Sequence, residues 1–245
     1  MPMRANQPGL PARVAVWIST LMSIVLMQSV HAQAVCQGSS VKGPQALHER
    51  FISADCESCW QSAHAASGEV PGLSLDWIVP SPKGDNAPLS AAESSQALDR
   101  LQHMGAKPVP SQVQVDTPVH RDANLDLSIS FGVAVGPYRG ITIDLAVQRE
   151  KLPWPRLDLW VLMIERLSAG AEGSPIERRL VRNVLQHTWG QPNFQKKDGV
   201  WHAAELRAMS MPEGMQPDRT ELVAWLQTPQ GHVIGLAHAS CPTNS

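Results

Sequence analysis

Residues 49–60 read ERFISADCESCW. A short run that contains Phe51 and Ile52 leads directly into Cys56 and Cys59, which are separated by two residues. A Cys-x-x-Cys pair in this setting is typical of three kinds of site: a redox pair that exchanges electrons with other proteins, half of a metal site, or a structural disulfide. The choice depends first on the compartment in which the chain resides.

The segment 1–34 predicts a secretory signal peptide. A positively charged region precedes an almost entirely apolar run at 14–30, and HAQA at 31–34 offers the small residues that a signal peptidase recognises. A membrane anchor is the alternative, since a run of this length nearly spans a bilayer. The lack of a basic stop-transfer flank favours cleavage before Gln33 or Val35. We therefore expect a periplasmic or secreted protein of the bacterial envelope.

The charge of the chain argues against nucleic acid as a partner. The formal net charge is −2, and removal of the signal peptide takes away Arg4 and Arg13 but no acidic residue. No basic run of the kind that follows a phosphate backbone is present. We expect no nucleic-acid partner and no membrane span after cleavage, and the oligomeric state stays open.

All four cysteines remain in the mature chain, and an even number in an oxidising compartment favours disulfides. Closeness in sequence favours a Cys56–Cys59 pair, which leaves Cys36 to pair with Cys241. A disulfide that closes so long a loop stabilises by roughly 4–5 kcal/mol in the chain-entropy model. We interpret the second pair as a structural staple.

The N-terminal half predicts alternating strands and helices. The expected strands are 47–53, 73–80 and 109–116, and the expected helices are 56–67, with Asp55 as its N-cap, and 89–105, closed by Gly105.

After about residue 122 the pattern changes to the alternation of antiparallel strands. These are expected at 125–135, 141–149, 156–167, 200–209, 221–228 and 232–240. The segment 175–190 is ambiguous between a helix and an extended loop.

A cysteine at the start of a helix has a physical reason to be reactive, because the helix dipole and unpaired N–H groups stabilise a thiolate. We predict Cys56 as the attacking thiol and Cys59 as the resolving thiol, facing inward under Trp60. Glu57 opposes this effect, since a carboxylate beside Cys56 raises the pKa of its thiol. The pair is therefore expected to be less oxidising than one with neutral or basic residues between its cysteines.

The segment ERFISADCESC resembles the VELFTSxGCSSC segment of a family of bacterial secreted proteins with a thioredoxin-like fold and no assigned function. VPSQVQV at 109–115 is similar to that family's TPQ-V-V segment. Further similar segments lie at 158–165, 179–190 and 221–237, so the resemblance covers roughly 46–240. The family's usual Pro-Pro after the second cysteine is replaced here by Trp60-Gln61.

In thioredoxin-like domains a cis-proline faces the cysteine pair, and the resemblance assigns this role to Pro110. An ordinary trans proline at the start of a strand is the alternative. The patterns and the resemblance predict an α+β chain: a thioredoxin-like α/β part at 35–122, packed on an antiparallel β-rich part at 123–245.

The function that we expect is thiol–disulfide exchange on envelope proteins, without a cofactor. The alternative is a non-catalytic binding or structural protein of the envelope, in which the Cys56–Cys59 disulfide only locks a loop. A metal site is the main chemical competitor: it would combine both cysteines with His64 and with His48 or His120. It lacks a second closely spaced ligand pair, and we expect no metal.

Other functions find less support. The motifs of serine hydrolases, zinc proteases and phosphate-binding loops are absent. The eight tryptophans could line a carbohydrate groove, but their spread through predicted strands favours packing. The basic cluster formed by Arg178, Arg179 and Arg182 is interpreted as a solvated surface.

Overall fold

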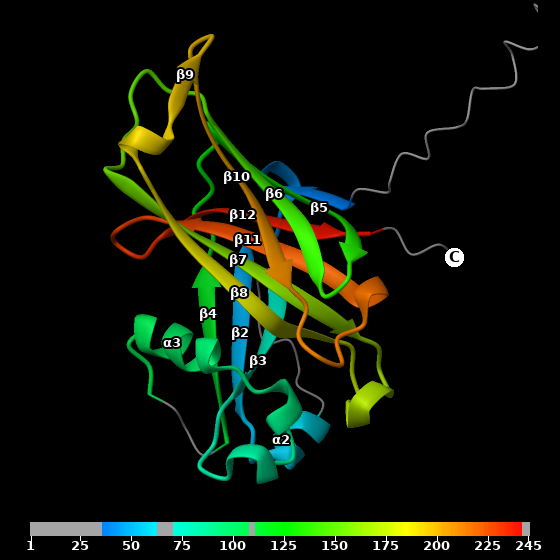
Figure 1. Cartoon of the computed structure of the whole chain (residues 1–245). Coiled ribbons are helices and arrows are strands. Elements are labelled where there is room, and N and C mark those ends of the chain that lie inside the picture. Colours follow the sequence, from blue (N-terminus) through cyan, green and yellow to red (C-terminus); the bar gives the residue numbers. More distant parts are fainter. Residues whose placement is uncertain (1–35, 63–70, 108–110, 242–245) are drawn as a thin grey trace, which may run out of the picture. The chain divides into compact units, whose positions relative to one another are not determined.

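Two β-sheets dominate the chain. The computed structural model describes residues 36–62, 71–107 and 111–241; the predicted signal peptide and Pro110 lie outside these ranges. The smaller sheet contains, in spatial order, β1 (Cys36–Ser39), β5 (Leu125–Val135), β6 (Tyr138–Val147), β10 (Val200–Ser210) and β9 (Gln195–Lys197). The larger sheet contains β12 (Val233–Ser240), β11 (Thr220–Gln227), β7 (Arg156–Leu167), β8 (Arg178–Gly190), β3 (Leu73–Val79), β2 (Ala46–Ser53) and β4 (Gln112–Pro118) (Figure 1).

Helices are few and short. The two α-helices of the described ranges are α2 (Glu57–Gln61) and α3 (Ser95–His103). Single turns of 3-10 helix connect other elements: η1 (Ser40–Lys42), η2 (Gly84–Asn86), η3 (Ser90–Ala92), η4 (Ala171–Gly173), η5 (Gln191–Asn193) and η6 (Pro217–Arg219). Among the described residues, no helix is long and apolar enough to cross a membrane.

The central strands β7 and β11 are buried on both faces, which explains their nearly continuous apolar sequences. Leu159 and Val161 of β7 pack with the inner face of the five-stranded sheet. Trp160 and Leu162, which point the opposite way, pack with Phe51 and other apolar residues of β2 and β3. The strands β7 and β11 therefore separate two apolar cores.

Helix α3 covers one end of the second core. The Ser94 hydroxyl accepts a hydrogen bond from the Gln96 N–H at 3.2 Å and caps the helix. At the other end Gly105 has a φ of 70°, a left-handed conformation that glycine adopts readily. The helix thus begins later than the predicted residue 89, and Gly105 follows it as expected.

A buried ion pair joins α3 to β2. The Arg100 guanidinium donates to both carboxylate oxygens of Glu49, at 3.0 and 2.6 Å. The same guanidinium lies 4.7 and 4.9 Å from the ring centroids of Trp160 and Trp225, whose rings stack. These contacts compensate for the burial of both charges.

The predicted thioredoxin-like α/β part is wrong. Of the described residues, 53% lie in strands and 16% in helices, which makes this a β-rich fold. The predicted strands are present: β2 pairs in parallel with β3 and antiparallel with β4. However, β3 also pairs with β8 through the Asp76–Leu180 bridge, which joins these strands to β8, β7, β11 and β12 in one sheet.

The larger sheet therefore contains strands from both predicted domains, and the described residues all belong to one compact unit. The boundary at residue 122 itself stays a prediction. The expected antiparallel strands of the second half are confirmed as β5, β6, β7, β10, β11 and β12, and the ambiguous segment 175–190 forms the long strand β8.

The predicted staple between Cys36 and Cys241 is confirmed. Cys36 begins β1 and Cys241 directly follows β12, so the disulfide ties the two ends of the described chain together. Strands β1 and β12 also approach each other closely at this end of the chain. A Cβ on Gly38 of β1 would collide with the carbonyl oxygen of His238 of β12. The presence of disulfides is compatible with an extracellular location.

The tryptophans mostly serve packing, as predicted. Trp60, Trp77, Trp160, Trp189 and Trp225 are all buried in the cores. Trp154 and Trp201 are half-buried and pack against the first core.

Candidate functional site

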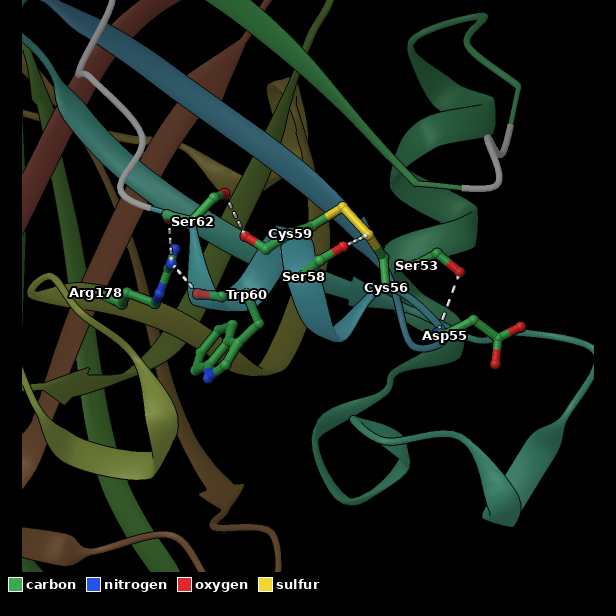
Figure 2. The surroundings of a disulfide bond; sticks show 8 residues. All are labelled: Ser53, Asp55, Cys56, Ser58, Cys59, Trp60, Ser62 and Arg178. Carbon is green, nitrogen blue, oxygen red and sulfur yellow. Dashed lines mark hydrogen bonds between the residues drawn. A yellow bond between two sulfur atoms is a disulfide. The ribbon is translucent and has the colours of Figure 1, made fainter.

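Cys56 and Cys59 form a disulfide at the end of β2 (Figure 2). The chain turns sharply after the strand, and the Cys56 N–H donates to the Ser53 carbonyl oxygen at 2.9 Å. The Cys59 N–H in turn donates to the Cys56 carbonyl oxygen at 3.1 Å and opens the helical turn. The rigid strand β2 therefore positions the disulfide.

The helix that follows is shorter than predicted within the described range. It runs from Glu57 to Gln61, and Cys56 occupies the N-cap position without a side-chain cap hydrogen bond. The prediction of Asp55 as N-cap is therefore wrong. The Asp55 N–H donates to the Ser53 hydroxyl at 3.3 Å, and its carboxylate forms an ion pair with Lys83 at 3.4 Å.

The two cysteines differ in burial. Cys59 is 9% exposed and belongs to a small core with Ile52, Ala54 and Trp60. Cys56 is half-buried and packs against the edge of that core. This difference agrees with the predicted inward position of Cys59.

Two polar side chains flank Cys56. The Ser58 hydroxyl lies 3.6 Å from the Cys56 sulfur, within hydrogen-bonding distance for sulfur. The exposed Glu57 accepts a hydrogen bond from the Gln61 amide at 3.0 Å, one helical turn further on. The Ser58 hydroxyl would stabilise a Cys56 thiolate by donating a hydrogen bond, and the negative charge of Glu57 would destabilise it.

Trp60 anchors the cysteine helix to the larger sheet. Its indole N–H donates to the Glu172 carbonyl oxygen at 2.7 Å. The Arg178 guanidinium lies 4.5 Å from the Trp60 ring centroid and donates to the carbonyl oxygens of Trp60 and Ser62, at 2.5 and 3.2 Å (Figure 2). These contacts fix both the side chain and the backbone of the residue next to Cys59.

The interpretation of the basic cluster as a solvated surface is wrong for Arg178 and Arg182. The side chain of Arg178 is 0% exposed, and that of Arg182 is 8% exposed. Strand alternation could have given a signal, because Arg178 lies on the same side of β8 as the buried Leu180.

Arg178 also reaches a second buried arginine through Asp76. Arg178 Nη1 donates to one oxygen of Asp76 at 3.1 Å, and Arg50 Nε donates to the other at 2.7 Å. Burial raises the pKa of the Asp76 carboxyl, and the Arg50 guanidinium opposes this rise. A cavity of about 200 Å³ lies beside the three side chains, and its lining includes His48, Gln114 and Arg179.

The predicted position of Pro110 falls outside the described residues, and so does that of His64. Ser111 directly follows Pro110. Its carbonyl oxygen accepts a hydrogen bond at 2.8 Å from the N–H of Ser53, which precedes Cys56 by three residues. The role of Pro110 as a cis-proline stays a prediction.

The structure does not assemble the alternative metal site from the residues that it describes. The His48 ring lies 2.8 Å from an Asp116 oxygen, and the His120 ring lies 5.5 Å from that of His232. Over the described ranges, no group of three or more His, Cys, Asp or Glu side chains has an arrangement that could hold a metal ion.

Comparison with known proteins gives no family for this chain. No family model and no curated protein matches the sequence. Among solved structures, HBP35 of Porphyromonas gingivalis is similar with a TM-score of 0.44 and 10% identity, over 83% of this chain and 78% of that one. Chicken MD-1 in complex with lipid IVa gives a TM-score of 0.24 and 13% identity, over 52% of this chain and 96% of that one. Neither likeness is strong enough to support an argument, and membership of the secreted family stays a prediction.

Proposed function

We propose that the protein is an exported thiol–disulfide exchange protein of the periplasm or the extracellular space, and that Cys56–Cys59 is its reactive disulfide. The observation that carries this proposal is the unequal burial of the two cysteines. Exchange requires one sulfur that an incoming thiolate can reach and a second that is released. Cys56 offers the first and Cys59 the second.

The exchange balances in two displacement steps. A substrate thiolate attacks the Cys56 sulfur, the disulfide bond breaks, and Cys59 leaves as a thiolate that takes up a proton. A second substrate thiolate then attacks the substrate sulfur of the mixed disulfide and releases Cys56 as a thiolate. Two substrate thiols are oxidised to one disulfide while the Cys56–Cys59 disulfide gains two electrons. The reverse sequence reduces a substrate disulfide.

The surroundings of Cys56 support this role. When Cys56 is a thiolate, the Ser58 hydroxyl at 3.6 Å can rotate to donate a hydrogen bond to it. Glu57 disfavours the same thiolate by charge repulsion, although its hydrogen bond to Gln61 holds the carboxylate along the helix. The competing effects predict a moderately oxidising pair.

A second candidate is a non-catalytic envelope protein in which the disulfide is structural. The anchoring of Trp60 by Arg178 and Glu172 favours it, because such contacts are typical of a segment held in one conformation. The two candidates differ in the reactivity of Cys56.

Reaction with glutathione disulfide separates them. The test uses the exported protein as the Cys59→Ser and Cys56→Ser variants, each with a single free thiol at the site. We expect Cys56 in the first variant to form a mixed disulfide with glutathione at least about tenfold faster than Cys59 in the second, because access and thiolate character set the rate. Intact-mass spectrometry follows both reactions. Equally slow reaction of the two variants contradicts the proposal and supports the structural role.

A further inference from the structure

We propose that the cavity beside Arg50 and Arg178 binds a small oxyanion, either a carboxylate or a phosphate group. This cavity lies on the face of β2 and β3 opposite to Phe51 and Trp77, and it is lined by His48, Arg50, Asp76, Gln114, Arg178 and Arg179 among others. The proposal does not rest on the thiol–disulfide function.

The first argument is the charge balance at the cavity wall. The side chains of Arg50 and Arg178 are 7% and 0% exposed, and both guanidiniums contact the carboxylate of Asp76. Within the described ranges, Asp76 is the one carboxylate in ion-pair contact with either of them. Two buried positive charges therefore share one negative charge. An unbalanced buried charge is costly, and an anion in the adjacent cavity would compensate for it.

The second argument is an unsatisfied donor. Nη1 of Arg50 is buried and has no hydrogen-bond acceptor among the described residues. Buried guanidinium donors are rarely left without an acceptor. Because Nη1 has almost no accessible surface, an oxyanion in the cavity reaches it only if the guanidinium turns. The arginines that line the cavity match carboxylate and phosphate groups in a bidentate geometry.

The third arginine at the cavity, Arg179, is partly exposed and already forms ion pairs. The Arg179 side chain is 27% exposed and forms ion pairs with Glu177 and Glu221. Glu177 is half-exposed and also lines the cavity. The cavity lining itself contains three arginines and two carboxylates, and Glu221, which pairs with Arg179, does not line the cavity.

The volume is sufficient for a small oxyanion. A cavity of about 200 Å³ is well above the roughly 10–15 Å³ that one water needs on the same measure. It accommodates one phosphate or carboxylate group with a short substituent.

Binding is tested by thermal unfolding and calorimetry on the exported protein at constant ionic strength. Sodium chloride is replaced stepwise by sodium phosphate in one arm and by sodium acetate in the other. We expect the Tm to rise with the logarithm of the concentration of one or both anions, as binding to the folded state requires. A response to phosphate alone identifies a phosphate ligand, and a response to acetate alone identifies a carboxylate ligand.

Variants locate the site. Arg50→Met and Arg179→Gln should each weaken the anion affinity at least about tenfold, which corresponds to about 1.4 kcal/mol. Arg207→Gln, which removes an exposed arginine of the five-stranded sheet, should leave the affinity unchanged. If Arg50→Met does not fold, two other measurements locate the site: the anion affinity of Arg179→Gln, and the shifts of the arginine Nε–Hε NMR signals of the wild type during the anion titration. The proposal is overturned if neither anion raises the Tm beyond chloride, or if both pocket variants bind as tightly as the wild type.

Discussion

The backbone carbonyl of Trp60 accepts a hydrogen bond from the guanidinium of Arg178 at 2.5 Å, although the two residues lie 118 positions apart in the sequence. Trp60 directly follows Cys59, and Arg178 begins β8. The position of the cysteine helix therefore depends on the larger sheet as well as on the strand that precedes it.

Replacement of Arg178 by Met should lower the free energy of unfolding by at least about 2 kcal/mol. The variant loses the charged hydrogen bonds to the Trp60 and Ser62 carbonyl oxygens and the contact with the Trp60 ring. Urea denaturation measures the change. Arg207→Gln is the matched control, because the Arg207 side chain is 46% exposed and its ion pair with Glu205 should contribute less than about 1 kcal/mol. Equal stability of both variants would contradict the anchoring role.

Replacement of both Cys36 and Cys241 by Ser should cost up to about 5 kcal/mol, because the open chain gains conformational entropy when it unfolds. The reactivity of Cys56 should be unchanged, since the two disulfides belong to separate parts of the fold. Denaturation curves and the glutathione reaction test these two expectations side by side. A large loss of Cys56 reactivity in a folded double variant would argue against their independence.

Replacement of Ser58 by Ala should slow the reaction of the free Cys56 thiol with glutathione disulfide. The variant removes the hydroxyl at 3.6 Å that can donate to the thiolate. Ser90→Ala, in a turn between β3 and α3, is the control and should react like the wild type. The measurement is the rate of mixed-disulfide formation in the Cys59→Ser background. An unchanged rate in Ser58→Ala would show that the hydroxyl has no such role.

The stability contributed by Glu221 should depend on pH. Burial raises the pKa of Glu221, but the hydrogen bond from His238 and the charge of Arg179 outweigh burial and hold the pKa below its ordinary value of 4.5. A carboxyl with a lowered pKa stabilises the fold above its unfolded-state pKa, and this contribution is lost as the pH falls through the folded-state value. Glu221→Gln should therefore be less stable than the wild type at pH 7, and the difference should shrink below about pH 4.5. Urea denaturation across this range tests it, and a constant difference would contradict the pairing.

Local patterns were sufficient to predict most of the elements. The alternation of apolar residues in LDLSISFGVAV gives β5, and the continuous apolar character of DLWVLMIE gives β7, because these patterns follow from burial on one face and on two faces. The Cys36–Cys241 pair followed from elimination within a set of four cysteines.

Long-range pairing was not predictable from the same patterns. The bridge between Asp76 and Leu180 joins β3 to β8. The sequence near β3 does not specify which distant strand will pair with its free edge. This contact converts an expected α/β domain into part of a larger sheet. Arg178 was missed for a related reason, since only the tertiary structure supplies the carboxylate and carbonyl oxygens that allow its burial.

The reduction potential of the Cys56–Cys59 disulfide tests the central claim most directly. It is measured by equilibration with glutathione buffers, in the wild type and in Glu57→Gln. The proposed exchange function predicts a potential above about −300 mV, and a still higher potential in Glu57→Gln, because loss of the carboxylate stabilises the reduced thiolate form. A potential well below about −300 mV that does not respond to Glu57→Gln would contradict the claim and identify the disulfide as structural.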